Sequence, residues 1–343
     1  MLTVIAYYQT LTVSFPPHQS LVFCACWIKP STLMLTINPK IFTKASLFLL
    51  SLLLSATLWA QDINQLKTLA NKGDSEAQFE LGVIYDNGDQ LPQDLKKAAY
   101  WYTKSAQQGH VDAQYNIGDM YRTGDGVTQD YVQAVQWLSK AADQGSIEAQ
   151  NDLGYLYMEG IGVPQDYRKA FELLSQSANQ GYAYAQNNLG TLYEKGLGVP
   201  QNYKMALAWF VMASEQQLDL AELNLGSLYF MGHGTKQDYQ KAAKWYQKAA
   251  DRGYGDALSN LGIMYQHGLY FEKDYAKALD MFQAAAQQGS SMGKYNLGNL
   301  YQLGLGVPKN LDTARDLFQE ACQEGSDQSC VALTQLLKKR LSK

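Results

Sequence analysis

Few residues of this 343-residue chain can form metal or disulfide centres, since it contains only 4 Cys and 4 His. That content excludes a disulfide-dense miniprotein and a protein with several zinc sites. Charged residues make up 17% of the chain, against about 25% in typical soluble domains. The formal net charge is -4, and no long basic run indicates nucleic-acid binding. What the chain does have in excess is Gly and Tyr, with 28 and 24 residues.

The first 60 residues lack Asp and Glu altogether. From Met34 onward, two lysines precede an apolar stretch at residues 47–54, and small or polar residues follow up to Ala60. This order is typical of a secretory signal peptide. We therefore interpret residues 34–60 as a signal cleaved near Ala60, and residues 1–33 as the product of a start assigned too early.

Removal of the first 60 residues takes away three lysines and changes the net charge from -4 to -7. The apolar stretch is shorter than the about 20 residues of a bilayer span, so we expect no stable membrane span in the mature chain. The predicted location is the bacterial periplasm or the outside of the cell. An intracellular scaffold with an uncleaved amino-terminal anchor is the alternative.

The remainder, residues 61–343, is built from copies of a 36-residue repeat. Such a repeat must be recognised before any other feature is interpreted. Stretches such as AQYNIGDMYRTGDGV and AQNDLGYLYMEGIGV recur at this interval. Partial cap units occupy residues 61–76 and 329–343. The seven full copies begin at Ala77, Ala113, Ala149, Ala185, Ala221, Ala257 and Gly293.

Each copy predicts a helix, a loop and a second helix. Positions 1, 5, 8 and 9 of the repeat are apolar or small and share one helical face, so that face should be buried. Position 6 is Gly in all seven copies, although a mid-helix Gly costs about 1 kcal/mol relative to Ala. We therefore expect a close backbone approach at position 6.

The helix ends are also predicted by the repeat. Gly88 and its equivalents should end the first helix by adopting positive φ. The Asp or Asn at position 18, from Asp94 to Asn310, should cap the second helix. That helix carries Ala at position 22 and a bulky apolar residue at position 25, from Trp101 to Leu317, which we interpret as a packing stripe.

The pattern AxxxLGxxYxxGxGVxQDYxxAxxWxxxAAxxG resembles the Sel1-like repeat, a relative of the tetratricopeptide repeat, over nearly all of residues 61–343. The resemblance implies an all-α, right-handed superhelical solenoid with a concave binding face. A stack is also expected from the residues, because one helix pair cannot bury its apolar face without neighbours. Three departures should change only local structure: Leu91-Pro92, Tyr270-Phe271 and the ending SEQQ of the fourth copy.

Cys322 and Cys330 lie eight residues apart, on either side of the turn at Gly325. A turn between antiparallel helices can bring such positions to disulfide distance, whereas one continuous helix would hold them about 12 Å apart. The spacing resembles that of the secreted Helicobacter cysteine-rich proteins, which bridge successive helices in this way. We predict a disulfide on the last repeat, with two buried free thiols as the alternative.

No catalytic or metal motif is complete. The histidines of the repeats fall at different positions, so no metal and no cofactor is predicted. Ser291-Met-Gly-Lys294 fits Ser-x-x-Lys, and Arg122-Thr123-Gly124 imitates Lys-Thr-Gly, but no Ser-Asp-Asn accompanies them. We expect a non-enzymatic protein. The alternative is a cell-envelope protein that binds penicillin or peptidoglycan fragments and has weak β-lactamase-like activity.

A partner-binding surface is predicted on the first helix, at positions 3, 7, 10 and 11, which point away from the buried stripe. Aromatic side chains often dominate interfaces, and the apolar candidates are Tyr115, Tyr155, Met158, Phe230, Met231 and Tyr295. Amides at position 4 offer donors and an acceptor to a peptide backbone: Asn116, Asn188, Asn224, Asn260 and Asn296. The favoured alternative is that these amides bond neighbouring repeats. The sequence thus predicts an exported scaffold or adaptor for a protein or peptide partner.

Overall fold

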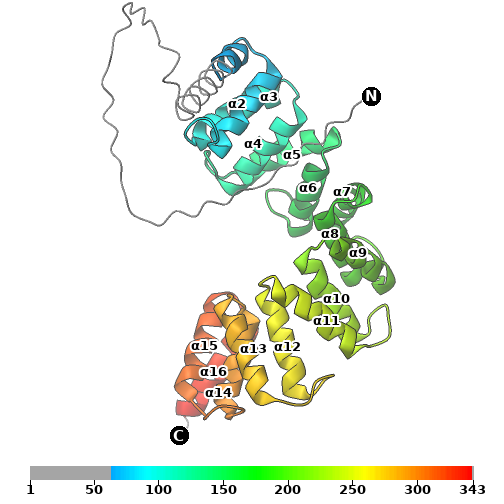
Figure 1. Ribbon diagram of the computed structural model, residues 1–343, viewed down its shortest axis with the longest axis vertical. Helices are drawn as coiled ribbons and strands as arrows, with labels where there is room; N and C mark the ends of the chain where they lie inside the picture. The colour runs from blue at the N-terminus through cyan, green and yellow to red at the C-terminus, as the bar shows by residue number, and fades with distance from the viewer. Residues whose placement is uncertain (1–62, 342–343) are drawn as a thin grey trace, which may run out of the picture. The chain divides into compact units, whose positions relative to one another are not determined.

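The computed structural model describes residues 63–341, so the interpretations of residues 1–33 and 34–60 concern residues outside the described range. A helical segment at residues 63–71 precedes the labelled helices (Figure 1). These are α2 (Ser75–Asn87), α3 (Leu95–Gln107), α4 (Val111–Thr123), α5 (Tyr131–Asp143), α6 (Ile147–Glu159), α7 (Tyr167–Asn179), α8 (Ala183–Lys195), α9 (Tyr203–Glu215), α10 (Asp219–Met231), α11 (Tyr239–Asp251), α12 (Gly255–His267), α13 (Tyr275–Gln287), α14 (Ser291–Leu303), α15 (Leu311–Gln323) and α16 (Asp327–Leu341).

The even-numbered helices from α2 to α14 are the first helices of the seven repeats, and the odd-numbered helices are the second ones. Each first helix packs most extensively on the second helix of its own repeat, which in turn packs on the next first helix. First helices of neighbouring repeats also meet directly, as α12 does with α14 and α6 with α8. This arrangement confirms the all-α solenoid of 36-residue repeats. Within residues 63–341, no helix is long and apolar enough to cross a bilayer.

The helix ends form as the sequence predicts. Gly88 and its six equivalents adopt φ between 69° and 89° and close the first helices. The Asp or Asn at position 18 accepts backbone N–H groups in every repeat, as Asp166 does from Arg168 and Lys169 at 3.0 Å. Position 17 adds a contact that the sequence analysis missed: Gln165 donates to the carbonyl of Met158 at 2.9 Å. The loop is therefore bonded to both helices that it joins.

The glycine at position 6 is required by a side chain, not by the backbone approach that we expected. A Cβ at Gly226 would lie 2.5 Å from the ring of Tyr246, which is residue 26 of the repeat. In each repeat the nearest atom belongs to the equivalent side chain, at 2.5 to 3.0 Å. The bulky residue that packs within the repeat is therefore the one after position 25. These residues are Tyr102, Leu138, Leu174, Phe210, Tyr246, Phe282 and Phe318.

In six of the seven repeats, a polar pair joins the start of the first helix to the end of the second helix. In the first four repeats both partners are glutamines, and the amide of Gln144 donates to Gln114 at 2.7 Å. The buried glutamine also donates to the end of the preceding second helix, at the carbonyl of Ala106. In the fifth repeat an ion pair replaces the amides, with Arg252 3.2 Å from Glu222.

Two non-glycine residues occupy positive-φ backbone positions that most other copies of the repeat give to glycine. Gln217, in the ending SEQQ, has a φ of 65°, and Tyr270 has a φ of 68°. Left-handed backbone costs a residue with a Cβ about 1–2 kcal/mol. Both residues follow the path of the other copies, so these departures alter local structure and not the fold.

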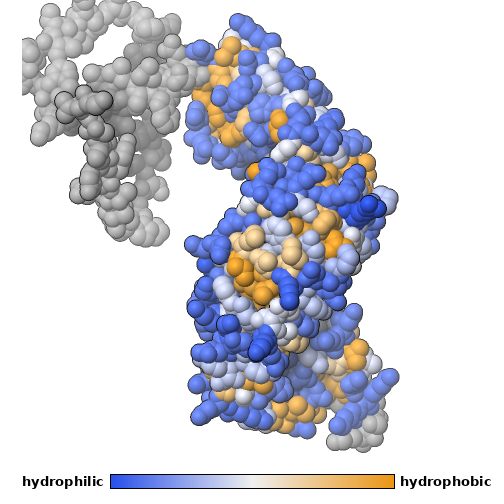
Figure 2. All heavy atoms as spheres, turned by 90° about the vertical axis from the view of Figure 1, so that its right-hand side faces the viewer, coloured by the Kyte–Doolittle hydropathy of each residue, from blue (hydrophilic) through white to orange (hydrophobic). Residues whose placement is uncertain are grey.

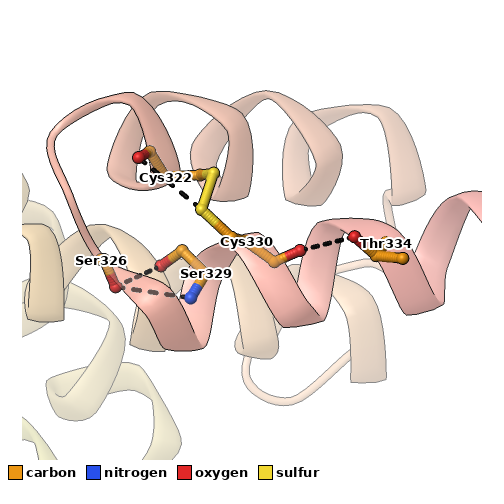
Figure 3. The surroundings of a disulfide bond; sticks show 5 residues. All are labelled: Cys322, Ser326, Ser329, Cys330 and Thr334. Carbon is orange, nitrogen blue, oxygen red and sulfur yellow. Dashed lines mark hydrogen bonds between the residues drawn. A yellow bond between two sulfur atoms is a disulfide. The ribbon is translucent and has the colours of Figure 1, made fainter.

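The predicted disulfide is present (Figure 3). Cys322 in α15 and Cys330 in α16 have their Cα atoms 4.7 Å apart, because the turn after α15 reverses the chain. Next to the bridge, the carbonyl of Cys330 accepts from the Thr334 hydroxyl at 2.8 Å (Figure 3). The bridge ties the last described helix to the seventh repeat.

Candidate functional site

One side of every first helix is not used for packing within the repeat. It comprises positions 3, 4, 7, 10 and 11 and the residue before position 1, which together lie opposite the buried stripe on a helical wheel. We call this surface the first-helix face. Because first helices of neighbouring repeats contact each other, their faces adjoin along the stack. Figure 2 shows one side of the molecule, on which apolar side chains gather in separate patches divided by hydrophilic ones.

Two of the apolar candidates are well exposed on the first-helix face: Tyr155 at 43% and Met231 at 61%. Met158 is a wrong assignment, because only 9% of it is exposed and it packs in a core cluster with Ala185 and Leu189 of the next repeat. Position 10 lies at the edge of the face, where the following first helix covers it.

The other three apolar candidates are partly buried. Phe230 packs its ring against Tyr239 of α11, with centroids 5.3 Å apart. The Tyr295 ring lies 5.8 Å from that of Phe318. The hydroxyl of Tyr115 donates to Asp152 in the next repeat at 3.4 Å. These rings support neighbouring helices as well as bordering the face.

Three of the amides at position 4 bond the preceding first helix. Asn188 donates to Asn151 at 3.1 Å, Asn224 to Asn187 at 2.9 Å, and Asn296 to the Ser259 hydroxyl at 3.1 Å. Position 3 supplies the acceptor each time. For Asn116 and Asn260 the corresponding residues are Phe79 and Leu223, whose side chains have no acceptor. The bonds give the stacking role a physical basis, and peptide binding by these amides stays a prediction.

Several exposed contributors to the face are not among the residues predicted from the sequence. Tyr184, the residue before position 1 of the fourth repeat, is 55% exposed, and Leu303 at position 11 of the seventh is 62% exposed. The signal was available, since a helical wheel extended by one residue toward the amino terminus places Tyr184 beside position 4.

The charge of the face changes along the chain. In repeats 1 to 3 it carries a single basic residue, Arg122. In repeats 5 to 7 its only acidic residue is Asp256, which accepts from the Ser290 hydroxyl at 2.5 Å. The acidic residues of repeats 1 to 3 are Glu76, Glu80, Asp86, Asp112, Asp119, Glu148, Asp152 and Glu159. The apolar aliphatic and Phe residues of repeats 5 to 7 are Leu220, Leu223, Phe230, Met231, Ile263, Met292 and Leu303.

The Ser-x-x-Lys match lies at the start of α14. The Ser291 hydroxyl donates to Glu324 at 3.0 Å, and Lys294 pairs with Glu324 and, at 3.5 Å, with Glu320. The bond to Glu324 raises the pKa of Lys294 above its usual value. Both side chains thus bond the end of α15, as position 2 does in other repeats. Within the described part of the chain, no three His, Cys, Asp or Glu side chains are grouped to hold a metal ion.

Comparison with known proteins adds sequence and structural relatives. The Sel1 repeat matches seven times, at residues 75–110, 111–146, 147–182, 183–218, 219–254, 255–290 and 291–326. No curated protein matches the chain significantly.

Three solved structures illustrate the likeness. A protective antigen of uropathogenic Escherichia coli, described as having an SLR fold, is 34% identical over 82% of the chain, with a TM-score of 0.63. The chain covers 60% of that antigen. A Sel1 repeat protein from Oxalobacter formigenes is 32% identical over 82% of the chain and 81% of its own length, with a TM-score of 0.61. Helicobacter pylori cysteine rich protein B is 29% identical over 39% of the chain and 96% of its own length, with a TM-score of 0.32.

Proposed function

Because the chain belongs to the Sel1 repeat family, we propose that it is an exported scaffold that binds a protein partner on the first-helix face. One observation carries the proposal. Interior positions such as the glycine at position 6 are constant through seven copies, whereas the first-helix face varies widely at every position except position 4 and exposes Tyr155, Tyr184, Met231 and Leu303. A large exposed side chain that no stacking contact requires is a candidate for partner recognition.

Export is supported by the charge and hydropathy order of residues 34–60, by the Cys322–Cys330 disulfide and by the antigen among the relatives. Disulfides persist in oxidising compartments. Amino-terminal sequencing of the protein from its native cell tests this part. A mature start at Gln61 is expected, and an intact residue 60–61 bond in the cell-associated protein would favour the anchored alternative.

Site-specific photo-crosslinking in the native envelope tests the binding face. A photoreactive residue is placed at Tyr155 or Met231, and at Glu172 or Lys244 as matched exposed sites on second helices. We expect one crosslinked partner band from the first pair that is absent from the second pair. Equal capture from all four sites would place the interaction elsewhere. Phe230 is unsuitable as a probe because it packs against α11.

We propose further that the chain is not a penicillin-acylating enzyme. If the lysine of a Ser-x-x-Lys site is to take the serine proton, it must be present as the free amine, and the raised pKa of Lys294 keeps it protonated at neutral pH. Arg122-Thr123-Gly124 belongs to the second repeat and Ser291 to the seventh. Incubation with a labelled penicillin should leave the protein unlabelled. Labelling that a Ser291→Ala variant abolishes would establish the alternative instead.

A further inference from the structure

Asp152 interrupts the amide pattern of the first-helix face. Position 4 is Asn in five copies, but the third copy has Asp, which can only accept hydrogen bonds when ionised. Asn151 donates to one of its oxygens at 2.8 Å, and the Tyr115 hydroxyl donates to the other at a longer 3.4 Å. Among the described residues no basic side chain forms an ion pair with Asp152. Arg122, whose nearby charge lowers the pKa of Asp152, is itself bonded to Asp119 at 2.5 Å and 2.8 Å.

Burial raises the pKa of Asp152 above its usual range, and the nearby charge of Arg122 offsets this only in part. Asp152 is nevertheless not fully buried. A cation arriving from outside could pair with it directly, and a charge-assisted hydrogen bond is about twice as strong as a neutral one.

Tyrosine rings lie beside this carboxyl. Tyr182 occupies the N-cap of α8 but makes no side-chain capping bond, so helix capping does not explain it. Burial, and then the charge of Asp152, raise its pKa. Its ring centroid is 5.6 Å from that of Tyr184, which is exposed. Aromatic rings next to a carboxylate attract Lys and Arg side chains through cation–π contacts.

The surroundings carry the same sign of charge. Glu148 and Glu159 flank Asp152 on α6 and are exposed. Toward the amino terminus, an open recess of about 340 Å³ is bordered by Asp86, Asp119 and Asp125. A concave surface lined by one sign of charge concentrates the opposite charge, and this recess has room for a second basic side chain. In the described range, no three His, Cys, Asp or Glu side chains lie close enough together to hold a metal ion. A basic side chain of a protein therefore fits this surface better than a metal ion does.

We infer that the first-helix face of repeats 2 to 4 binds a basic segment of the protein partner, with a lysine or arginine side chain bonded to Asp152 beside Tyr115 and Tyr182. This inference rests on the proposed function and names the chemistry of the partner. The same contacts are absent from repeats 5 to 7, where position 4 is Asn throughout.

Fluorescence anisotropy with two synthetic peptides tests the inference on the full chain. The probe is a labelled 12-residue peptide in which Lys alternates with Gly or Ser, and its control has Gln at every Lys position. We expect the Lys peptide to bind at about 0.15 M salt and the Gln peptide not to bind. Failure of the wild-type chain to bind the Lys peptide at about 1 mM would overturn the inference.

Variants locate the contact. Asp152→Asn installs the residue that five other copies carry, and should weaken binding about tenfold, because the bond to the cation is no longer made by a charged group. Glu172→Gln removes the same charge from an exposed site on α7 and should change affinity less than twofold. Tyr182→Phe keeps the ring and should bind like wild type, whereas Tyr182→Ala should bind several-fold more weakly.

Equal losses for Asp152→Asn and Glu172→Gln would show unspecific charge attraction and contradict the inference. A failure of this inference can be distinguished from a failure of the proposed function. If photo-crosslinking at Tyr155 captures a partner and Asp152→Asn leaves both that capture and peptide binding unchanged, the scaffold role stands and the basic-segment inference is wrong.

Discussion

Repeats 1 to 3 and repeats 5 to 7 have the same helix-loop-helix arrangement, yet their first-helix faces differ in charge. The first group presents eight acidic residues and one basic residue there, and the second presents a single acidic residue, Asp256. The constant positions are those that stack the repeats, and the varying ones face outward. The difference shows that a repeat protein can change what it recognises along its length without changing how it folds.

The interiors also differ between repeats. Leu138 and Leu174 cover the position-6 glycine in repeats 2 and 3, whereas aromatic rings cover it in repeat 1 and in repeats 4 to 7. The polar pair at positions 2 and 32 is Gln–Gln in repeats 1 to 4 but Glu222–Arg252 in the fifth. In each of these exchanges the new residues still contact each other. Equivalent mutations in different repeats should therefore change the stability of the protein by different amounts.

The largest expected difference concerns the position-6 glycine. Gly226→Ala places a Cβ 2.5 Å from the buried ring of Tyr246 and should destabilise the protein by about 2–3 kcal/mol, as overpacked cores do. In repeat 2, Gly118→Ala meets the branched side chain of Leu138 at 3.0 Å, which can adjust, and Ala recovers about 1 kcal/mol of helix propensity. Urea unfolding measures both, and equal losses would show that the aromatic and leucine interiors do not differ.

Next comes the ion pair of repeat 5. Arg252→Gln leaves the buried carboxylate of Glu222, which is 1% exposed, without its cation and should cost about 2 kcal/mol. The double variant Glu222→Gln with Arg252→Gln recreates the amide pair of repeats 1 to 4 and should recover most of that loss. A double-mutant cycle from thermal unfolding measures the coupling. Arg168→Gln, in an exposed pair, should have no measurable effect.

A smaller effect is expected when position 4 is exchanged between the groups. Asp152→Asn should stabilise the protein by about 1 kcal/mol at neutral pH, because it removes a poorly compensated charge. Asn224→Asp should destabilise by a similar amount, because it loses the donor to Asn187. The raised pKa of Asp152 means that its ionisation costs stability as pH rises. The gain from Asp152→Asn should therefore vanish below the ordinary carboxyl value of 3.8, as unfolding measured against pH will show.

An effect of similar size, confined to a single turn, is expected in the fourth repeat, between the two groups. Gln217→Gly should stabilise by about 1 kcal/mol, since Gly occupies the equivalent positive-φ site in the other six repeats. Gln217→Ala serves as the control and should change stability little. Hydrogen exchange of α9 and α10 is the measurement, and no difference between the two variants would mean that the φ of 65° carries no strain.

The regular elements could be predicted because they repeat. Caps such as Asp94, the glycines that end helices, and the Cys322–Cys330 bridge each follow from local chain chemistry, and the structure confirms them. Met158 could not be placed correctly, because a helical wheel describes one helix and the residue is covered by the following repeat. The partner of the position-6 glycine was missed for the same reason, since Tyr102 and its equivalents approach from another helix.

By itself the sequence determined the period, the helix boundaries and the buried stripe of this protein, because hydrophobic spacing and capping act within a few residues. Tertiary structure alone decided which outward positions remain free. Only the stacking of one repeat on the next brings Tyr115 against Asp152, with which no cation of the described residues forms an ion pair. The physical reason is that burial and charge compensation depend on neighbours about 36 residues away in the chain, which no single helix specifies.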